Sequence, residues 1–469
     1  MNQRILANLG FLLQTSGLLT LLPIAVGFVF NETQALIPLF ITCVTFLGVG
    51  FLLNALCERK DLNVKSSSTL LFMAFVILPL ICTIPYVFVD PFNSPNILDR
   101  FTNSFFESVS GFTTTGFSFI ADTATIPRCL LVFRSLTELM GGVGLVFLVL
   151  AFFQSRRALP KLGGILGIDN LNRNLKKMFL YVFAVYSIYI MGFTALFYAM
   201  GYTDVIASGS FVIDTVTGGF APSAEQFEQY LFVAPKILMI LMMFIGSVNF
   251  AFHYYLLSGK VKKFISAEVS MFIAILVLTS VAVALVGKVD VLDATFHVVS
   301  LASTAGGTYI DMSALNANAL SILTLVMLIG GCAFSMAGGI KVSRLITLGR
   351  GIGLQLKRVF RKTKRGKQKE NGQSEVLPAV EAILLFAAVL IVFSFLFSTI
   401  GISLQDAFFE VGSAISTTGA TLGAITVMMP VAYKWLIIAA MIVGKVEVLT
   451  VIVILLPFTV KRLKRKTIA

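Results

Sequence analysis

Ten apolar runs of roughly 20 residues recur along the 469-residue chain. A helix of that length measures about 30 Å, which matches the hydrocarbon core of a bilayer, so each run can cross a membrane. Only 13% of the residues are charged, against about 25% in a typical soluble domain. The sequence therefore predicts an all-α polytopic protein of the cell membrane. The predicted spans are residues 5–30, 35–56, 69–89, 129–153, 179–200, 233–257, 268–287, 319–343, 379–402 and 431–457.

Residues suited to enzyme chemistry are sparse. The five cysteines show neither metal-ligand nor redox spacing. The two histidines, His253 and His297, are far apart and lack an HExxH context. We therefore expect no enzyme activity and no covalent cofactor. The cysteines, expected as small apolar fillers, are Cys43, Cys57, Cys82, Cys129 and Cys332.

Positive charge gathers on one side of this topology. The net charge is +13, and Lys and Arg concentrate in alternate loops and at the C-terminus, with the largest cluster in residues 341–376. By the positive-inside rule, these loops and both termini are cytoplasmic. An alternative is that the clusters also bind anionic membrane lipid or a cytosolic partner. Nucleic acid is not expected as a partner, because no soluble domain is predicted. Of the 36 Lys and Arg residues, only seven lie elsewhere: Arg100, Arg128, Arg134, Lys236, Lys288, Lys434 and Lys445.

Four loops on the opposite side share a two-part pattern, which predicts an internal repeat. Each begins at an Asn or Asp that suits a helix N-cap and ends at a glycine 13 or 14 residues later. The expected caps are Asn103, Asp204, Asp293 and Asp406. Ten helical residues span about 15 Å, half of a membrane, so each loop is expected to hold a half-helix. The Ser/Thr-rich ends, here called the candidate filter segments, are Thr113–Gly116, Thr215–Gly218, Ser303–Gly306 and Ser416–Gly419.

Non-helical backbone at membrane depth is tolerated only where protein buries it or where it lines a watery path. Four such segments around one axis would direct carbonyl oxygens and threonine hydroxyls at a central cation and replace its hydration shell. The half-helix C-termini, each carrying about −0.5 e, would favour a cation over an anion. One segment alone would be an ordinary turn, whereas four in register predict a pore. The predicted ligands are Thr114, Thr115, Gly116, Val216, Thr217, Gly218, Thr304, Ala305, Gly306, Thr417, Thr418 and Gly419.

Two further stretches carry a family resemblance: GGCAFSMAGGIKV from Gly330, and GKVEVLT from Gly444. Together with the four repeats, they make nearly the whole chain similar to the Trk/Ktr/HKT superfamily of potassium transporters. Two spans before the first repeat make it most similar to the TrkH-type membrane subunit. The resemblance implies a homodimer with one pore in each protomer and a cytosolic TrkA-like ring of nucleotide-binding regulatory subunits. Because all four filter positions are glycine, it also implies potassium rather than sodium.

The resemblance further implies an intramembrane gate below the filter. Residues 331–342 correspond to the gating loop of the family, and their glycines also predict a broken helix from the sequence itself. Close helix packing through small residues is the alternative. Where the family has Gly-Arg, this chain has Gly444-Lys445, so Lys445 either keeps the charge of a pore barrier or pairs with a carboxylate such as Glu447. The implied gate residues are Gly331, Ser335, Gly338, Gly339, Lys341 and Lys445.

Charged residues inside the predicted membrane segments are costly and mark function by default. Arg134 and Glu138 are four residues apart, and we expect them to pair within their helix. Glu107 and Glu410 lie in the half-helices. They either concentrate cations or accept hydrogen bonds from neighbouring backbone.

The sequence thus predicts two N-terminal helices and four helix–pore half-helix–helix repeats around a central pore that takes up potassium. Alternatives are a less selective K+/Na+ transporter and a secondary transporter of a small solute, which would show inverted repeats. Passive or coupled flux, and the regulatory nucleotide, stay open. The expected units are the accessory helices 1–66 and the repeats 67–177, 178–266, 267–376 and 377–469.

Overall fold

The structure, a computed structural model, describes residues 3–57, 62, 64–152, 175–220, 232–257, 265–309, 312, 315–360 and 373–446. The regular structure within these ranges is helical throughout, in agreement with the all-α prediction. Three helices come first: α1 (Gln3–Leu19), α2 (Leu21–Val29) and α3 (Thr33–Leu56). The first predicted span corresponds to α1 and α2, which meet at Thr20.

Four helix–half-helix–helix repeats follow. The first contains α4 (Val64–Val89), α5 (Ile97–Phe112) and α6 (Arg128–Phe152), with a 3-10 turn, η1 (Thr123–Thr125), before α6. The second contains α8 (Leu175–Ala199), α9 (Val205–Thr217), α11 (Val233–Ser247) and α12 (Phe250–Leu257). The third contains α14 (Ala267–Gly287), α15 (Val291–Ala302), α16 (Ala317–Ile329) and α17 (Val342–Phe360). The fourth contains α18 (Gln373–Ser398), α19 (Leu404–Ile415) and α20 (Val431–Val446).

Every predicted span therefore has a helical counterpart among the described residues, but two spans besides the first are divided. The sixth span divides into α11 and α12, and the eighth into α16 and α17. Much of the basic sequence, including residues 361–372 and 458–469, lies outside the described residues. Within the described ranges, five helical segments are long and apolar enough to cross a membrane by length and composition: Gln3–Val29, Thr33–Leu56, Ser66–Val89, Ala267–Gly287 and Val376–Ser398.

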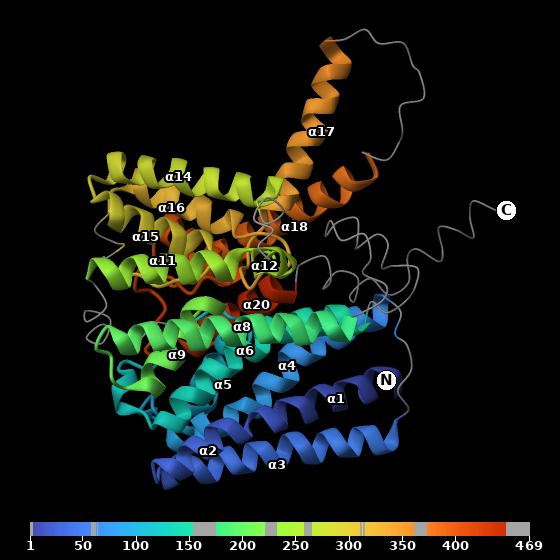
Figure 1. The fold of residues 1–469 in the computed structure, drawn as a ribbon, viewed down its shortest axis with the longest axis vertical. Coiled ribbons are helices and arrows are strands. Elements are labelled where there is room, and N and C mark those ends of the chain that lie inside the picture. Colours follow the sequence, from blue (N-terminus) through green and yellow to red (C-terminus); the bar gives the residue numbers. More distant parts are fainter. Residues whose placement is uncertain are drawn as a thin grey trace, which may run out of the picture.

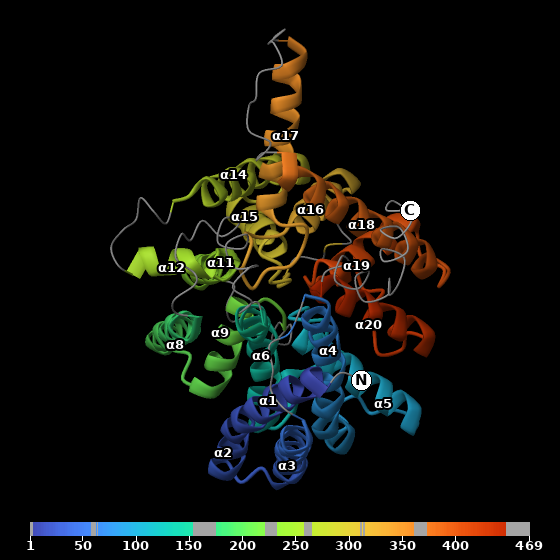
Figure 2. The ribbon, with the colours of Figure 1, turned by 90° about the vertical axis from the view of Figure 1, so that its right-hand side faces the viewer.

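The four repeats surround a common axis, with the half-helices α5, α9, α15 and α19 between the longer helices (Figure 2). Neighbouring repeats contact one another in order: α6 packs on α9, α11 on α15, α16 on α19, and α20 on α5. The last contact closes the circle. Helices α1 and α3 pack on each other and on α4, while α17 projects from the body (Figure 1).

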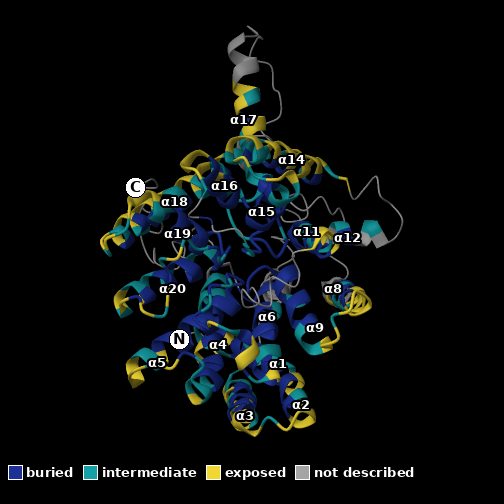
Figure 3. Ribbon diagram, turned by 90° about the vertical axis from the view of Figure 1, so that its left-hand side faces the viewer, coloured by how far each residue is buried: buried dark blue, intermediate teal, exposed yellow. Residues whose placement is uncertain are grey.

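Burial follows the same plan, because the centre of the ring of helices is buried and the rim is exposed (Figure 3). Large apolar side chains such as Phe40, Leu278 and Phe395 are exposed on the long helices. A rim of this kind suits lipid rather than water as its surroundings.

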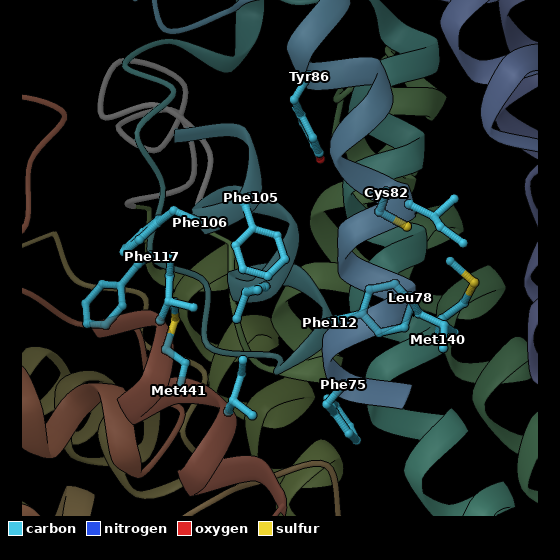
Figure 4. Close-up of a cluster of buried hydrophobic side chains, with 14 of the residues drawn as sticks. Phe75, Leu78, Cys82, Tyr86, Phe105, Phe106, Phe112, Phe117, Met140 and Met441 are labelled. Atoms are coloured by element: carbon cyan, nitrogen blue, oxygen red, sulfur yellow. The ribbon is translucent and has the colours of Figure 1, made fainter. Parts of the chain in front are cut away.

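An apolar cluster fixes the first half-helix between α4, α6 and α20 (Figure 4). Phe106 of α5 is fully buried, and its ring stacks on that of Phe119 with 4.1 Å between the centroids. This contact holds the chain that follows the first candidate filter segment against the half-helix. Other members of the cluster are Phe75, Leu78, Cys82, Tyr86, Phe105, Phe112, Phe117, Met140 and Met441.

Candidate functional site

Each half-helix begins at a side chain that accepts a hydrogen bond from a backbone N–H of the first turn. These caps are Asn96 of α5, Asp204 of α9, Asp290 of α15 and Ser403 of α19. Asp204 agrees with the sequence prediction, but the starts predicted at Asn103, Asp293 and Asp406 are wrong. Asp293 and Asp406 lie in the first helical turn, where a carboxylate suits the positive helix end without being the cap. In the first, third and fourth repeats, another capping residue stands three to seven positions before the predicted one, and it is this earlier residue that caps the helix.

Three of the four half-helices end in the same way. Thr114, Thr304 and Thr417, two residues before the glycines, have φ values of 52°, 58° and 53°. The next N–H then donates to a carbonyl five residues earlier, as from Thr115 to Ser110 at 2.9 Å. The second repeat differs, because α9 continues through Thr217 and the break comes at Gly218.

All four glycines of the candidate filter segments have positive φ: 84° at Gly116, 80° at Gly218, 71° at Gly306 and 79° at Gly419. A side chain there would be strained by the backbone angle alone. It would also meet the next repeat. A Cβ at Gly116 would overlap the backbone of Gly219, and a Cβ at Gly218 would lie 2.7 Å from the carbonyl oxygen of Thr304.

The remaining two contacts complete a ring. A Cβ at Gly306 would overlap the carbonyl oxygen of Thr418, and a Cβ at Gly419 would overlap that of Thr115. The contacts run from the first repeat to the second, third and fourth and back to the first. The structure therefore brings together all four candidate filter segments, with the twelve predicted ligand residues buried or half-buried.

Among the described residues, the carbonyl oxygens of this ring have few hydrogen-bond partners. Most buried carbonyls in proteins accept a hydrogen bond. In the first, third and fourth segments, no described residue donates one to the last three carbonyls, and the buried Thr417 hydroxyl also lacks a partner among the described residues. Such oxygens can instead coordinate a cation. The residues concerned are Thr114, Thr115, Gly116, Thr304, Ala305, Gly306, Thr417, Thr418 and Gly419.

Glu107 and Glu410 are fully buried and bind backbone. Glu107 Oε2 accepts a hydrogen bond from the Phe119 N–H at 3.0 Å. Glu410 Oε1 accepts one from the Leu422 N–H at 2.8 Å. Of the two sequence alternatives for these glutamates, hydrogen bonding to neighbouring backbone is confirmed. Both carboxylates thus hold the backbone just beyond a candidate filter segment by hydrogen bonds.

The predicted break in the eighth span is confirmed, because the chain is non-helical from Gly330 to Lys341. This loop lies against the ring. The Gly338 N–H donates to the Thr304 hydroxyl at 2.8 Å. A Cβ at Gly338 would overlap the carbonyl oxygen of Ser416. The loop therefore touches both the third and the fourth candidate filter segments.

The other predicted gate residues shape the loop itself. Gly331 leaves room for Ala337, and Gly339, at a φ of 76°, packs on the backbone of Gly330. The Ser335 hydroxyl donates to the carbonyl of Cys332 at 2.7 Å. Lys341 Nζ donates to the carbonyl of Ala337. These contacts fold the loop into one compact turn that lies against the ring.

Lys445 is buried on α20 and joins the ring to the loop. Its Nζ donates to the Thr114 hydroxyl at 2.6 Å and lies 3.4 Å from the carbonyl oxygen of Met336. No carboxylate among the described residues forms an ion pair with it. Glu447, the predicted alternative partner, lies outside the described residues.

Three features of the site were not predicted from the sequence. Arg134 pairs with Glu107 at 3.0 Å, so the predicted Arg134–Glu138 pair is wrong. Across a helix interface, the buried Glu107 offers a closer partner than the same helix does. The second is Glu268 Oε1, which accepts a hydrogen bond from the Ala333 N–H of the loop at 2.7 Å.

The third missed feature is the break between α11 and α12, which also supports the loop. The Cys332 N–H donates to the carbonyl of Ser247 at 2.9 Å, and the Phe250 N–H donates to that of Phe334 at 3.0 Å. The small and polar residues Gly246-Ser247-Val248-Asn249 inside an apolar span were the available sequence signal. They resemble the glycines that mark the break in the third repeat.

Four half-helices that place a closed ring of carbonyl oxygens inside a membrane-embedded bundle define a membrane transport protein, not an enzyme. The family model for TrkH, described as cation transport protein, matches residues 35–271 and 264–458. The chain therefore belongs to the TrkH family of cation transport proteins.

Individual relatives agree with this assignment. An uncharacterised cation transporter of Methanocaldococcus jannaschii is 26% identical over 98% of this chain and 96% of its own length. The Trk system potassium uptake protein TrkH of Escherichia coli K12 is 27% identical over 85% of this chain and 87% of its own length. The crystal structure of the potassium transporter TrkH from Vibrio parahaemolyticus has the same fold, with a TM-score of 0.84, 23% identity, and 97% and 98% of the two chains covered.

Proposed function

We propose that this chain takes up potassium ions across the cell membrane through the ring of candidate filter segments. The observation that carries the proposal is the closed ring of four glycines with positive φ, in which three segments have carbonyl oxygens that accept no hydrogen bond from any described residue. Such oxygens can replace the hydration shell of K+, and the half-helix C-termini favour a cation. Glycine at all four positions and the relatives named as potassium proteins favour K+ over a less selective K+/Na+ pathway. The twelve ring residues are the proposed ligands.

The loop Gly330–Lys341 and Lys445 are the proposed gate. Two hydrogen bonds support this assignment, one from the Gly338 N–H to Thr304 and one from Lys445 Nζ to Thr114. Both reach the threonine side chains two residues before the filter glycines. An element in that position limits the flux of ions that have already been selected.

The proposal extends to orientation and partners. Both termini and the basic loops face the cytoplasm, because positive charge stays on that side of a membrane. The chain has no ATP-binding motif, so nucleotide control comes from a separate cytosolic subunit of the TrkA kind. A second copy of the chain forms a homodimer, for which the projecting α17, with Ile352 and Leu354 exposed, offers a surface. The proposed repeat units are 67–177, 178–266, 267–376 and 377–469, and α4, α8 and α18 begin three or four residues before the respective boundaries.

Substitution of the filter glycines tests the proposal. Gly218→Ser is the mildest change, because its Cβ would stop 2.7 Å from Thr304, whereas Gly116→Ser would overlap backbone. We expect both to lower the ratio of K+ to Na+ permeability in proteoliposomes, with Gly116→Ser the more severe. Gly192→Ser is the matched control, since no atom lies within 4 Å of the added Cβ. Unchanged ratios in folded variants at Gly116, Gly218, Gly306 and Gly419 would rule out the filter assignment.

A further inference from the structure

In three repeats, the side chain at one equivalent position accepts a hydrogen bond from the backbone just beyond the filter glycine. Nine residues before the glycine stands Glu107, His297 or Glu410, and three residues after it stands the N–H that this side chain binds. The Phe119 N–H donates to Glu107 at 3.0 Å, and the Leu422 N–H donates to Glu410 at 2.8 Å. We call each such hydrogen bond a clasp.

The third repeat makes its clasp with an imidazole. His297 Nδ1 lies 2.7 Å from the carbonyl oxygen of Asp293, so Nδ1 carries the proton. Nε2 then carries no proton and accepts a hydrogen bond from the Tyr309 N–H at 3.5 Å. A histidine thus stands where the first and fourth repeats have glutamates, and its unprotonated Nε2 offers an acceptor without a negative charge.

The second repeat cannot make this clasp, because Gly209 stands nine residues before Gly218. Its half-helix also ends differently, since α9 continues through Thr217. The acceptor comes instead from the neighbouring α6. Glu138 Oε1 accepts a hydrogen bond from the Phe220 N–H at 2.7 Å, and its Oε2 lies 3.1 Å from the Thr217 hydroxyl. The carboxylate lies so close to Gly219 that a Cβ there would overlap it.

The surroundings of Glu138 support a fixed position. Its side chain is fully buried, and Arg134, one turn earlier on α6, places its guanidinium 3.5 Å from the centroid of the Phe220 ring. The same guanidinium pairs with Glu107 at 3.0 Å. Helix α6 therefore holds Phe220 by its ring and by its N–H, and links this clasp to that of the first repeat. Asp214 of α9 is a second buried carboxylate beside Glu138.

We propose that Glu138 is a positioning residue that supplies the clasp missing from the second repeat and thereby sets the K+ selectivity of the ring. The inference rests on the proposed function. The role depends on the reach of the side chain, meaning its length. From α6, the two carboxylate oxygens of Glu138 must contact the Phe220 N–H and the Thr217 hydroxyl, which follow a different helix or lie on it. A carboxylate one methylene shorter cannot reach both groups without moving α6 or the segment.

The test separates reach from charge with purified full-length protein in proteoliposomes. Glu138→Asp keeps the charge and loses the reach, and Glu138→Gln keeps the reach and loses the charge. We expect Glu138→Asp to lower the K+/Na+ permeability ratio about tenfold, the factor that corresponds to the loss of one buried hydrogen bond. We expect Glu138→Gln to stay within about threefold of the wild type, because its amide oxygen still accepts the Phe220 N–H. Melting temperatures in detergent identify the folded variants.

Glu268→Asp is the matched control. It shortens a carboxylate that also accepts a backbone N–H at 2.7 Å, but one that belongs to the loop. We expect it to change the flux and leave the permeability ratio unchanged. Should Glu138→Asp not fold, Glu138→Ala also lacks the reach and is expected to show the same fall.

A K+/Na+ permeability ratio like that of the wild type in Glu138→Asp or Glu138→Ala overturns the inference. So does a fall of the ratio in Glu138→Gln or Glu268→Asp as large as that in Glu138→Asp. In these cases the proposed function stands as long as the wild type prefers K+ and Gly218→Ser lowers that preference. A wild type without K+ preference overturns the proposed function, and the inference falls with it.

Discussion

Replacing Lys445 with methionine removes one positive charge from the junction of ring and gate while keeping most of the side-chain volume. The ammonium donates to the Thr114 hydroxyl at 2.6 Å. A cation held about 3 Å from the same oxygen would lie within about 6 Å of Nζ. The charge of Lys445 therefore acts on each ion that passes this end of the ring.

The size of the effect follows from Coulomb's law. At an effective dielectric constant of about 20, two unit charges about 6 Å apart repel each other by about 2.8 kcal/mol. Each 1.4 kcal/mol or so on a barrier changes a rate tenfold, so removal of the charge would raise the rate of ion passage about a hundredfold. We expect Lys445→Met to raise K+ flux toward that limit and Lys445→Arg to stay at or below the wild-type flux, because arginine keeps the charge and can also bind carbonyls.

K+ flux and thermal stability together distinguish a charge barrier at Lys445 from a structural ion pair. The expected result is a faster Lys445→Met protein whose melting temperature in detergent is close to that of the wild type. If Lys445 instead balanced a buried carboxylate such as Glu447, its removal would cost about 3–5 kcal/mol of stability. A slower and less stable Lys445→Met protein would therefore refute the barrier and place Lys445 in a structural pair.

Two further predictions concern the loop and the buried ion pair. Shortening residues 332–339 should raise K+ flux at an unchanged K+/Na+ ratio, because a gate limits flux without choosing the ion; reduced flux in a folded protein would mean that the loop is only packing. Arg134→Met should lower the free energy of unfolding by about 3–5 kcal/mol, since it leaves the buried Glu107 carboxylate without its counter-charge. Lys236→Met, which breaks the more exposed pair with Asp293, should cost less, and equal losses in the two variants would contradict this account.

The repeat architecture was accessible from the sequence because its signals are local. Apolar length predicted the spans, and the glycines at 116, 218, 306 and 419 predicted the ends of the half-helices. The same signals predicted the break in the third repeat. They could not decide between neighbouring caps, since Asp290 and Asp293 both suit the start of α15.

Contacts between repeats were less accessible, because they join residues far apart in the chain. Nothing in the sequence pairs Arg134 with Glu107 rather than with Glu138, which is four residues away on the same helix. Likewise, Gly209 signals that the second repeat lacks a clasp only once Glu107, His297 and Glu410 are seen to share one position. Pairings of this kind depend on packing geometry rather than on local pattern.

The central claim is that the ring passes potassium in preference to sodium. Its most direct test is ion flux through the purified protein in liposomes, with K+, Na+ and choline compared at equal concentration. We expect K+ flux well above Na+ flux and no flux of choline, because choline is too large for the ring carbonyls to take the place of its hydration water. Equal K+ and Na+ fluxes would contradict the claim, and choline flux would contradict a ring of this geometry altogether.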